Sequence, residues 1–239
     1  EIRRIDWKAL GKFDRYMIKE YEDETNLRAY LLVDGSASMN YASDGISKFD
    51  YACTLTASLA YLVLKQQDAA GVITFSNKIE SFVPPRSKRD YLLQIIHALE
   101  NRGPAGETNV AKILDELAGQ IRRRGLIVLI SDLLDEPEPI IKGLRQFRFK
   151  GNDVIVFHLL DQAELDLPFD GNILFEDLEA ADLQVIADPR AIRATYKEVV
   201  QEFVTDMRKQ CHDSAIDYQL ISTATPLDQA LASYLSWRG

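Results

Sequence analysis

Apolar and polar positions follow two different spacings along the chain from residue 27 onward. Continuous apolar runs predict strands covered on both faces, and they lie at residues 29–33, 70–75, 126–131 and 154–160. Apolar positions three or four residues apart predict helices, which lie at residues 48–65, 88–99, 109–122, 137–149, 189–212 and 226–237. Further strands are predicted at 79–83, where Pro84 and Pro85 end the strand, and at 217–222. This alternation predicts an α/β fold, with a mostly parallel central sheet and helices on both faces.

Residues 1–26 differ from the rest of the chain in their density of charge. Basic residues such as Arg3 and Arg4 come early, and acidic residues such as Glu22 and Glu24 come late. We therefore expect residues 1–26 to form an N-terminal extension or an edge strand at residues 16–18. Residues 27–239 are expected to form the main domain.

Oxygen-bearing side chains follow two of the predicted strands at the point where each strand ends, and another precedes a predicted helix. These residues are Asp34, Ser36, Ser38, Thr108, Ser131 and Asp132. If the two strands are neighbours, their loops converge at one edge of the sheet, where open α/β sheets bind ligands. Carboxylate and hydroxyl oxygens without His or Cys favour Mg²⁺, with Mn²⁺ or Ca²⁺ as alternatives, over zinc. A purely structural alternative is that Asp34 and the two serines cap the long helix at 48–65.

The spacing of these residues resembles a known adhesion motif. Asp34-Gly35-Ser36-Ala37-Ser38 is similar to the Asp-x-Ser-x-Ser signature of von Willebrand factor A domains, which have a Rossmann-like fold. The segments Gly106-Glu107-Thr108-Asn109 and Ser131-Asp132 resemble the Thr and Asp loops of the same metal-ion-dependent adhesion site. The resemblance implies that Ser36, Ser38 and Thr108 contact the ion directly, while Asp34 and Asp132 act through water.

A second resemblance extends over most of the chain. The segments that carry it are Arg3-Arg4-Ile5-Asp6-Trp7-Lys8, Ser131-Asp132-Leu133-Leu134-Asp135, His158-Leu159-Leu160-Asp161 and Leu167-Pro168-Phe169-Asp170-Gly171. They are similar to the bacterial domain-of-unknown-function 58 (DUF58) family. In that family further sequence precedes the Arg3–Lys8 stretch, so the resemblance implies that residues 1–26 are an N-terminal extension belonging to a truncated upstream module. This resemblance implies an adaptor or co-chaperone that accompanies a MoxR-type AAA+ ATPase and has no catalytic activity. The expected partner is a protein that supplies an acidic side chain to the ion.

Composition narrows the other classes of function. The 239 residues are 46% hydrophobic and have a formal net charge of −9, which disfavours nucleic acid as a partner. No apolar run approaches the roughly 20 residues of a spanning helix. Cys53 and Cys211 lie in apolar, helix-like stretches, which predicts reduced, buried thiols and a cytoplasmic location.

Enzymatic alternatives find weaker support in the sequence. Ser36 would need a histidine base, and each of the three histidines is explained by a structural role. The chain has no phosphate-binding loop of the G-x-x-x-x-G-K-[ST] type. The alternative that stays open is metal-assisted phosphoester hydrolysis using Asp34 and Asp132. Helix capping or loop solvation accounts for the other acids near strand ends, Asp135, Glu136 and Asp161.

Overall fold

The computed structural model describes residues 27–88, 90–100, 106, 109–176, 178 and 184–238, with side chains described as far as residue 233. Within these residues, one six-stranded sheet has the order β3-β2-β1-β4-β5-β8. Its strands are β1 (Arg28–Asp34), β2 (Ala69–Phe75), β3 (Ile79–Arg86), β4 (Leu126–Ser131), β5 (Asp153–Leu160) and β8 (Asp217–Ser222). All neighbouring strands are parallel except β2 and β3. The predicted α/β class and mostly parallel sheet are thereby confirmed.

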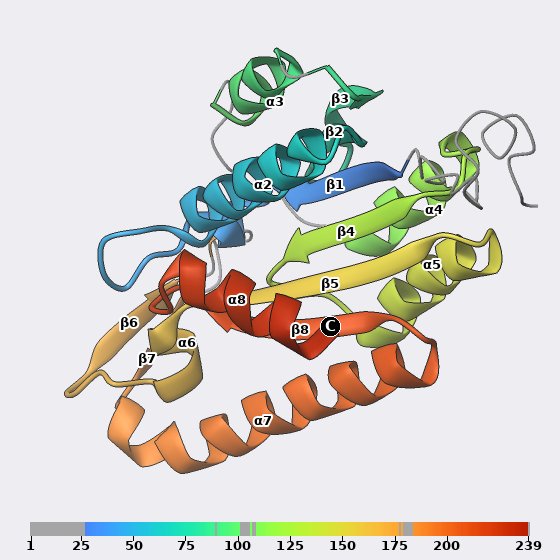
Figure 1. Ribbon diagram of the computed structural model, residues 1–239. Helices are drawn as coiled ribbons and strands as arrows, with labels where there is room; N and C mark the ends of the chain where they lie inside the picture. Colours follow the sequence, from blue (N-terminus) through green and yellow to red (C-terminus); the bar gives the residue numbers. More distant parts are fainter. Residues whose placement is uncertain are drawn as a thin grey trace, which may run out of the picture.

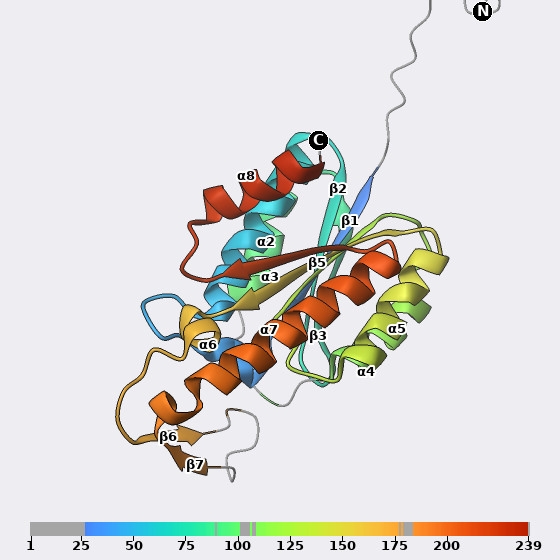
Figure 2. The ribbon, with the colours of Figure 1, turned by 90° about the horizontal axis from the view of Figure 1, so that it is seen from below.

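Helices cover both faces of this sheet (Figures 1 and 2). One face packs against α2 (Lys48–Lys65), α3 (Tyr91–Glu100) and α8 (Leu227–Arg238), and the other against α4 (Val110–Gln120), α5 (Pro137–Phe149) and α7 (Pro189–Asp213). Strand β1 serves both layers because successive side chains of a strand point to opposite faces. Leu31 and Val33 join the core beneath α2, while Tyr30 and Leu32 join the core beneath α4.

The predicted end of the third strand was wrong. Strand β3 continues through Pro84 and Pro85 to Arg86. It lies at the edge of the sheet, where proline costs no ladder hydrogen bond on the open side. Gly71 on β2 makes the close approach possible, since a Cβ there would lie 2.6 Å from the nitrogen of Pro85.

Three elements between β5 and α7 were not predicted. The short helix α6 (Gln162–Asp166) follows β5 directly, and strands β6 (Ile173–Glu176) and β7 (Gln184–Ala187) form an antiparallel hairpin. The hairpin projects beyond the sheet at the end of the molecule where α7 begins (Figure 2). Helix α6 carries a capping box between Asp161 and Glu164, a sequence signal that was available for predicting it.

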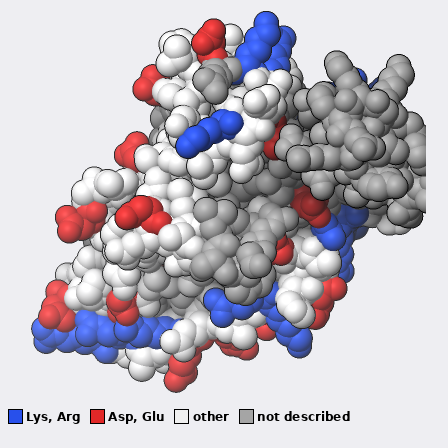
Figure 3. All heavy atoms as spheres, viewed as in Figure 1, with Lys and Arg blue, Asp and Glu red and all other residues white. Residues whose placement is uncertain are grey.

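Surface charge is interspersed on the face drawn in Figure 3. Helix α7 illustrates this, since Arg190 and Arg193 pair with Asp170, and Lys197 pairs with Asp166. Among the described residues, no helix is long and apolar enough to span a bilayer. The predicted extension at residues 1–26 lies outside the described part of the chain.

Candidate metal centre

Strands β1 and β4 are neighbours, as the predicted site requires. Val33 pairs with Ile130 in the parallel register, so the residues that follow them, Asp34 and Ser131, emerge together at the carboxyl edge. The chain then leaves β1 through a turn in which the Gly35 amide donates to the carbonyl of Phe75 at 2.7 Å. This turn leads into the short helix η2 (Ala37–Asn40). Two distant segments of the sequence thus meet at one rim of the sheet.

Asp34 is fully buried at the end of β1. Its Oδ1 accepts a hydrogen bond from the amide of Ser36 at 3.0 Å, and its Oδ2 accepts one from the hydroxyl of Ser131 at 2.6 Å. Burial, followed by the negative charge of Asp132, raises the pKa of Asp34 to about 7 despite these bonds. Two hydrogen bonds thus fix the orientation of the Asp34 carboxyl group, and no cation among the described residues forms an ion pair with it.

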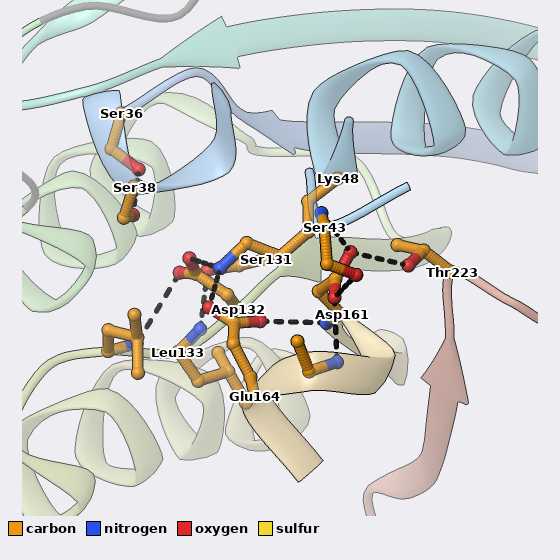
Figure 4. Close-up of polar contacts among 12 residues, drawn as sticks. Ser36, Ser38, Ser43, Lys48, Ser131, Asp132, Leu133, Asp161, Glu164 and Thr223 are labelled. Atoms are coloured by element: carbon orange, nitrogen blue, oxygen red, sulfur yellow. Dashed lines mark hydrogen bonds and ion pairs between the residues drawn. The ribbon is translucent and has the colours of Figure 1, made fainter. Parts of the chain in front are cut away.

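Ser36 and Ser38 face each other at the start of η2 (Figure 4). Both are buried, and their Oγ atoms lie 3.1 Å apart. They do not cap the long helix, because the N-cap of α2 is Ser47, whose side chain accepts from the amide of Asp50. The structural alternative proposed from the sequence is therefore wrong, and these two hydroxyls are left to another role.

The predicted third hydroxyl, Thr108, lies outside the described residues. Its described neighbours in the sequence are Gly106 and Asn109. The carbonyl of Gly106 accepts a hydrogen bond from the amide of Ala37 at 3.0 Å, which ties the segment before α4 to the Asp34–Ser38 turn. Helix α4 begins directly after this segment, with Asn109 as its N-cap, whose side chain accepts from the amide of Lys112.

Asp132 lies beyond the end of β4 and contacts a residue that sequence analysis did not single out. The Nζ atom of Lys48 lies 2.7 Å from Oδ2 of Asp132 and 2.6 Å from Oε1 of Glu164. Lys48 and Asp132 are completely buried, whereas the side chain of Glu164 is 21% exposed. The other oxygen of Asp132, Oδ1, lies 3.5 Å from the amide of Leu134, which is a long contact.

Electrostatics explain why Lys48 stays charged in this position. Burial acts to lower the pKa of Lys48, but Asp132 and Glu164 outweigh it, so that its pKa is raised above the usual value. Burial raises the pKa of Glu164 even with Lys48 in contact. The missed signal was a lysine at the first position of α2, where the helix dipole disfavours a cation.

Asp161 follows β5 at the same edge but has another environment (Figure 4). Its carboxylate accepts hydrogen bonds from the amide and hydroxyl of Ser43, the amide of Ala163 and the hydroxyl of Thr223. Burial acts to raise its pKa, but these bonds outweigh it and lower the pKa. The expected capping role of Asp161 is confirmed, because it begins α6 and also anchors the loop before α2.

The donor chemistry of this cluster fits a hard divalent cation. Among the described residues, no group of three or more His, Cys, Asp or Glu side chains could hold a metal, so hydroxyl oxygens would have to supply part of the ligand set. Adjacent ligands of an octahedral Mg²⁺ with bonds of 2.0–2.1 Å lie about 2.9 Å apart. The 3.1 Å between the Oγ atoms of Ser36 and Ser38 is close to that edge. Both oxygens of Asp34 already accept hydrogen bonds, which suits contact through water.

Comparison with known proteins places this geometry in context. The family described as "Protein of unknown function DUF58" matches residues 1–205. Uncharacterized protein Mb1516 of Mycobacterium bovis and Uncharacterized protein Rv1480 of Mycobacterium tuberculosis are each 24% identical to the chain over 212 residues. These residues make up 87% of this chain and 66% of the length of each relative. The chain therefore spans just under two thirds of the relatives it matches.

Solved structures agree on the fold. The conserved hypothetical protein BatB from Bacteroides thetaiotaomicron superposes with a TM-score of 0.59 at 14% identity, covering 88% of this chain and 98% of that one. The VWA domain of SpRpn10 superposes with a TM-score of 0.50 at 10% identity, covering 87% and 94%. The predicted von Willebrand factor A fold is confirmed by these likenesses.

Proposed function

Because this chain belongs to the DUF58 family and has the von Willebrand factor A fold, we propose that it is a protein-binding module that works through a divalent cation. Ser36, Ser38 and Thr108 would hold the ion directly, and Asp34 and Asp132 would hold it through water. The ion would supply an electrophilic centre that accepts a carboxylate oxygen from an acidic side chain of the partner. A MoxR-type AAA+ ATPase is the first candidate partner, on the family resemblance.

One observation carries this proposal. Two neighbouring strands deliver Asp34 and Asp132 to one rim, next to two buried hydroxyls that do not cap α2. Buried hydroxyls normally form hydrogen bonds that the fold requires. Two buried hydroxyls that do not cap α2 are therefore candidate ligands. Mg²⁺ is the expected ion, with Mn²⁺ or Ca²⁺ as alternatives, because all of these donors are hard oxygens.

Metal binding is tested by unfolding the protein in chelator and in excess Mg²⁺ or Mn²⁺. An ion that binds only the folded state stabilises it by about 2.7 kcal/mol at a hundredfold excess over Kd. We expect this increment in the wild type and in Asp170→Ala, which alters an exposed ion pair on α7. Asp34→Ala and Thr108→Ala should abolish or reduce it. An unchanged midpoint at millimolar metal in the wild type would contradict the proposal.

Partner capture is tested with the purified ATPase in the presence of Mg²⁺. Capture should be lost in chelator and in Asp34→Ala, and kept in Asp170→Ala. Full capture by Asp34→Ala would show that recognition does not use the ion. Incubation with phosphoesters and Mn²⁺ addresses the hydrolase alternative, since turnover above roughly 1 s⁻¹ would lie in the usual range for enzymes.

A further inference from the structure

Lys48 is the one described cation in contact with the candidate site, and the proposed function assigns it no role. Its Nζ atom contacts Asp132 at 2.7 Å and Glu164 at 2.6 Å, and its side chain is completely buried. The ring of Tyr41 also lies beneath it, with 5.9 Å from Nζ to the ring centroid. The backbone fixes the position as well, because the Lys48 amide donates to the carbonyl of Tyr41 at 3.1 Å.

The capping box of α6 holds the other end of this contact. Glu164 gives one oxygen to Lys48 and receives the amide of Asp161 on the other at 2.7 Å. The carboxylate is therefore held by α6 and does not depend on Lys48 alone. As a result, the lysine is clamped between two carboxylates that come from different elements.

The charges around the rim add up to a definite balance. Asp34, Asp132 and Glu164 are three carboxylates and Lys48 is one ammonium, and Asp161 adds a further negative charge at the same edge. The ionised rim is therefore negative, and a divalent cation would offset most of that charge. Without the lysine, the rim would have one more net negative charge, and a bound ion would leave it more strongly anionic and more repulsive to a partner's carboxylate.

We propose that Lys48 is a built-in counter-charge that lowers the affinity of the rim for divalent cations. The inference rests on the proposed function, because it concerns the same ion. An ammonium held against Asp132 in a buried site repels an approaching dication more strongly than it would in water. It also occupies Oδ2 of Asp132, which keeps that carboxylate in the outer shell. Lys48 is thus a positioning residue that sets the strength of the site.

The competing explanation is that Lys48 only orients Asp132. In that case, removing the lysine would misplace the carboxylate and weaken metal binding. The counter-charge explanation predicts the opposite sign, since removing a repulsive charge strengthens binding. The direction of the change in metal affinity therefore separates the two explanations.

Four proteins test the sign, with Kd for Mn²⁺ measured by calorimetry at pH 8. Lys48→Met keeps the length of the apolar stem and removes the charge, so its Kd should be about tenfold lower than that of the wild type. Glu164→Gln removes one negative charge and should raise Kd severalfold. The double variant Lys48→Met/Glu164→Gln restores the wild-type net charge, and its Kd should return to within about threefold of the wild type.

The outcomes separate the inference from the function on which it rests. Unchanged or weaker Mn²⁺ binding by Lys48→Met, beside clear binding by the wild type, would overturn the counter-charge and leave the metal site in place. Absence of Mn²⁺ binding in all four proteins would overturn the metal site and the inference together. If Lys48→Met fails to fold, the effect of removing the lysine is measured by comparing the double variant with Glu164→Gln. Kd should then be about tenfold lower in the double variant.

Discussion

Asp34 and Asp161 both follow a central parallel strand at the same edge of the sheet, yet their environments are opposite. Asp161 accepts four hydrogen bonds, from Ser43, Ala163 and Thr223, and its pKa is lowered. Asp34 accepts two, from Ser36 and Ser131, and its pKa rises to about 7. Hydrogen bonds from the fold compensate the charge of Asp161. The charge of Asp34 is compensated less, and a cation could balance it.

This comparison shows that burial alone does not identify a metal site. Both carboxylates are almost fully buried, and both sit where ligands bind in open α/β sheets. What differs is the number of donors that each one receives and the charge beside it. Burial and then the charge of Asp132 raise the pKa of Asp34, whereas hydrogen-bond donors from three separate segments outweigh burial and lower the pKa of Asp161. Four substitutions can break or sharpen this contrast.

The largest effect is expected from Asp34→Asn in chelator. Folded Asp34 keeps its proton up to about pH 7, whereas an unfolded Asp loses it near pH 4, so this group makes stability fall as pH rises through that window. At pH 8 the cost is roughly 4 kcal/mol, for about three pKa units. Asp34→Asn should remove this cost and unfold at higher urea than the wild type. At pH 4 the two proteins should have similar stability.

Asp34→Asn should also lose the stabilisation by Mn²⁺. In chelator it should therefore be more stable than the wild type, and on addition of Mn²⁺ it should gain less stability than the wild type. If Asp34→Asn is instead less stable than the wild type in chelator at pH 8, then hydrogen bonds compensate the charge of the Asp34 carboxylate, as they do for Asp161.

The next largest effect is expected from Asp161→Ala, which should destabilise the protein by about 3 kcal/mol. The substitution removes an N-cap and leaves the donors of Ser43 and Thr223 without an acceptor. Urea unfolding at pH 7 measures the loss, which should be the same in chelator and in Mn²⁺. Asp166→Ala is the matched control on the same helix, and its smaller change follows from its exposed position. A loss for Asp161→Ala that appears only in Mn²⁺ would place Asp161 at the metal.

Ser131→Ala should cost about 2 kcal/mol, because the hydroxyl donates to Asp34 and accepts from the amide of Leu133. Its hydrogen bond lowers the pKa of Asp34, so the variant should extend the fall in stability to higher pH. Unfolding in chelator at several pH values between 5 and 9 would measure both effects. An unchanged pH profile would mean that the serine does not hold the Asp34 carboxylate.

The smallest effect is expected from Thr223→Val. It removes the hydroxyl that donates to Asp161 at 3.2 Å and leaves the hydrogen bonds from Ser43 and Ala163. A loss of about 1 kcal/mol in urea unfolding is expected. Thr223→Ser keeps the hydroxyl and should behave like the wild type. Equal losses in the two variants would assign the effect to packing of the methyl group, and the hydrogen bond to Asp161 would then contribute little.

Much of the fold was predictable because its signals are local. The runs at residues 29–33 of β1 and 126–130 of β4 are apolar without interruption, as expected of strands between two helical layers. The hairpin of β6 and β7 was not predicted, since its four-residue strands carry no pattern long enough to distinguish them from a loop. The extension of β3 through Pro84 and Pro85 depended on its place at the sheet edge and on Gly71 of the neighbouring strand.

The residues of the candidate site also fall into those that the local sequence identifies and those that only the structure brings together. Asp34, Ser36, Ser38 and Asp132 were identified from spacing, since a strand followed by alternating oxygen donors is visible in the chain itself. Lys48 and Glu164 were not, because Lys48 lies 84 residues from Asp132 and 116 residues from Glu164 in the sequence and meets them only through packing. Thr108 lies outside the described residues, and its role stays a prediction.

The sequence by itself determined the layers, the direction of the strands and the oxygen donors, because each follows from short-range periodicity and from the ends of strands. Only the tertiary structure decided which carboxyl group is buried beside another negative charge and which one is surrounded by hydrogen-bond donors. That outcome depends on how many donors and charges reach Asp34, Asp132 and Asp161 from distant segments, and electrostatic energy in a buried site is set by distance in space.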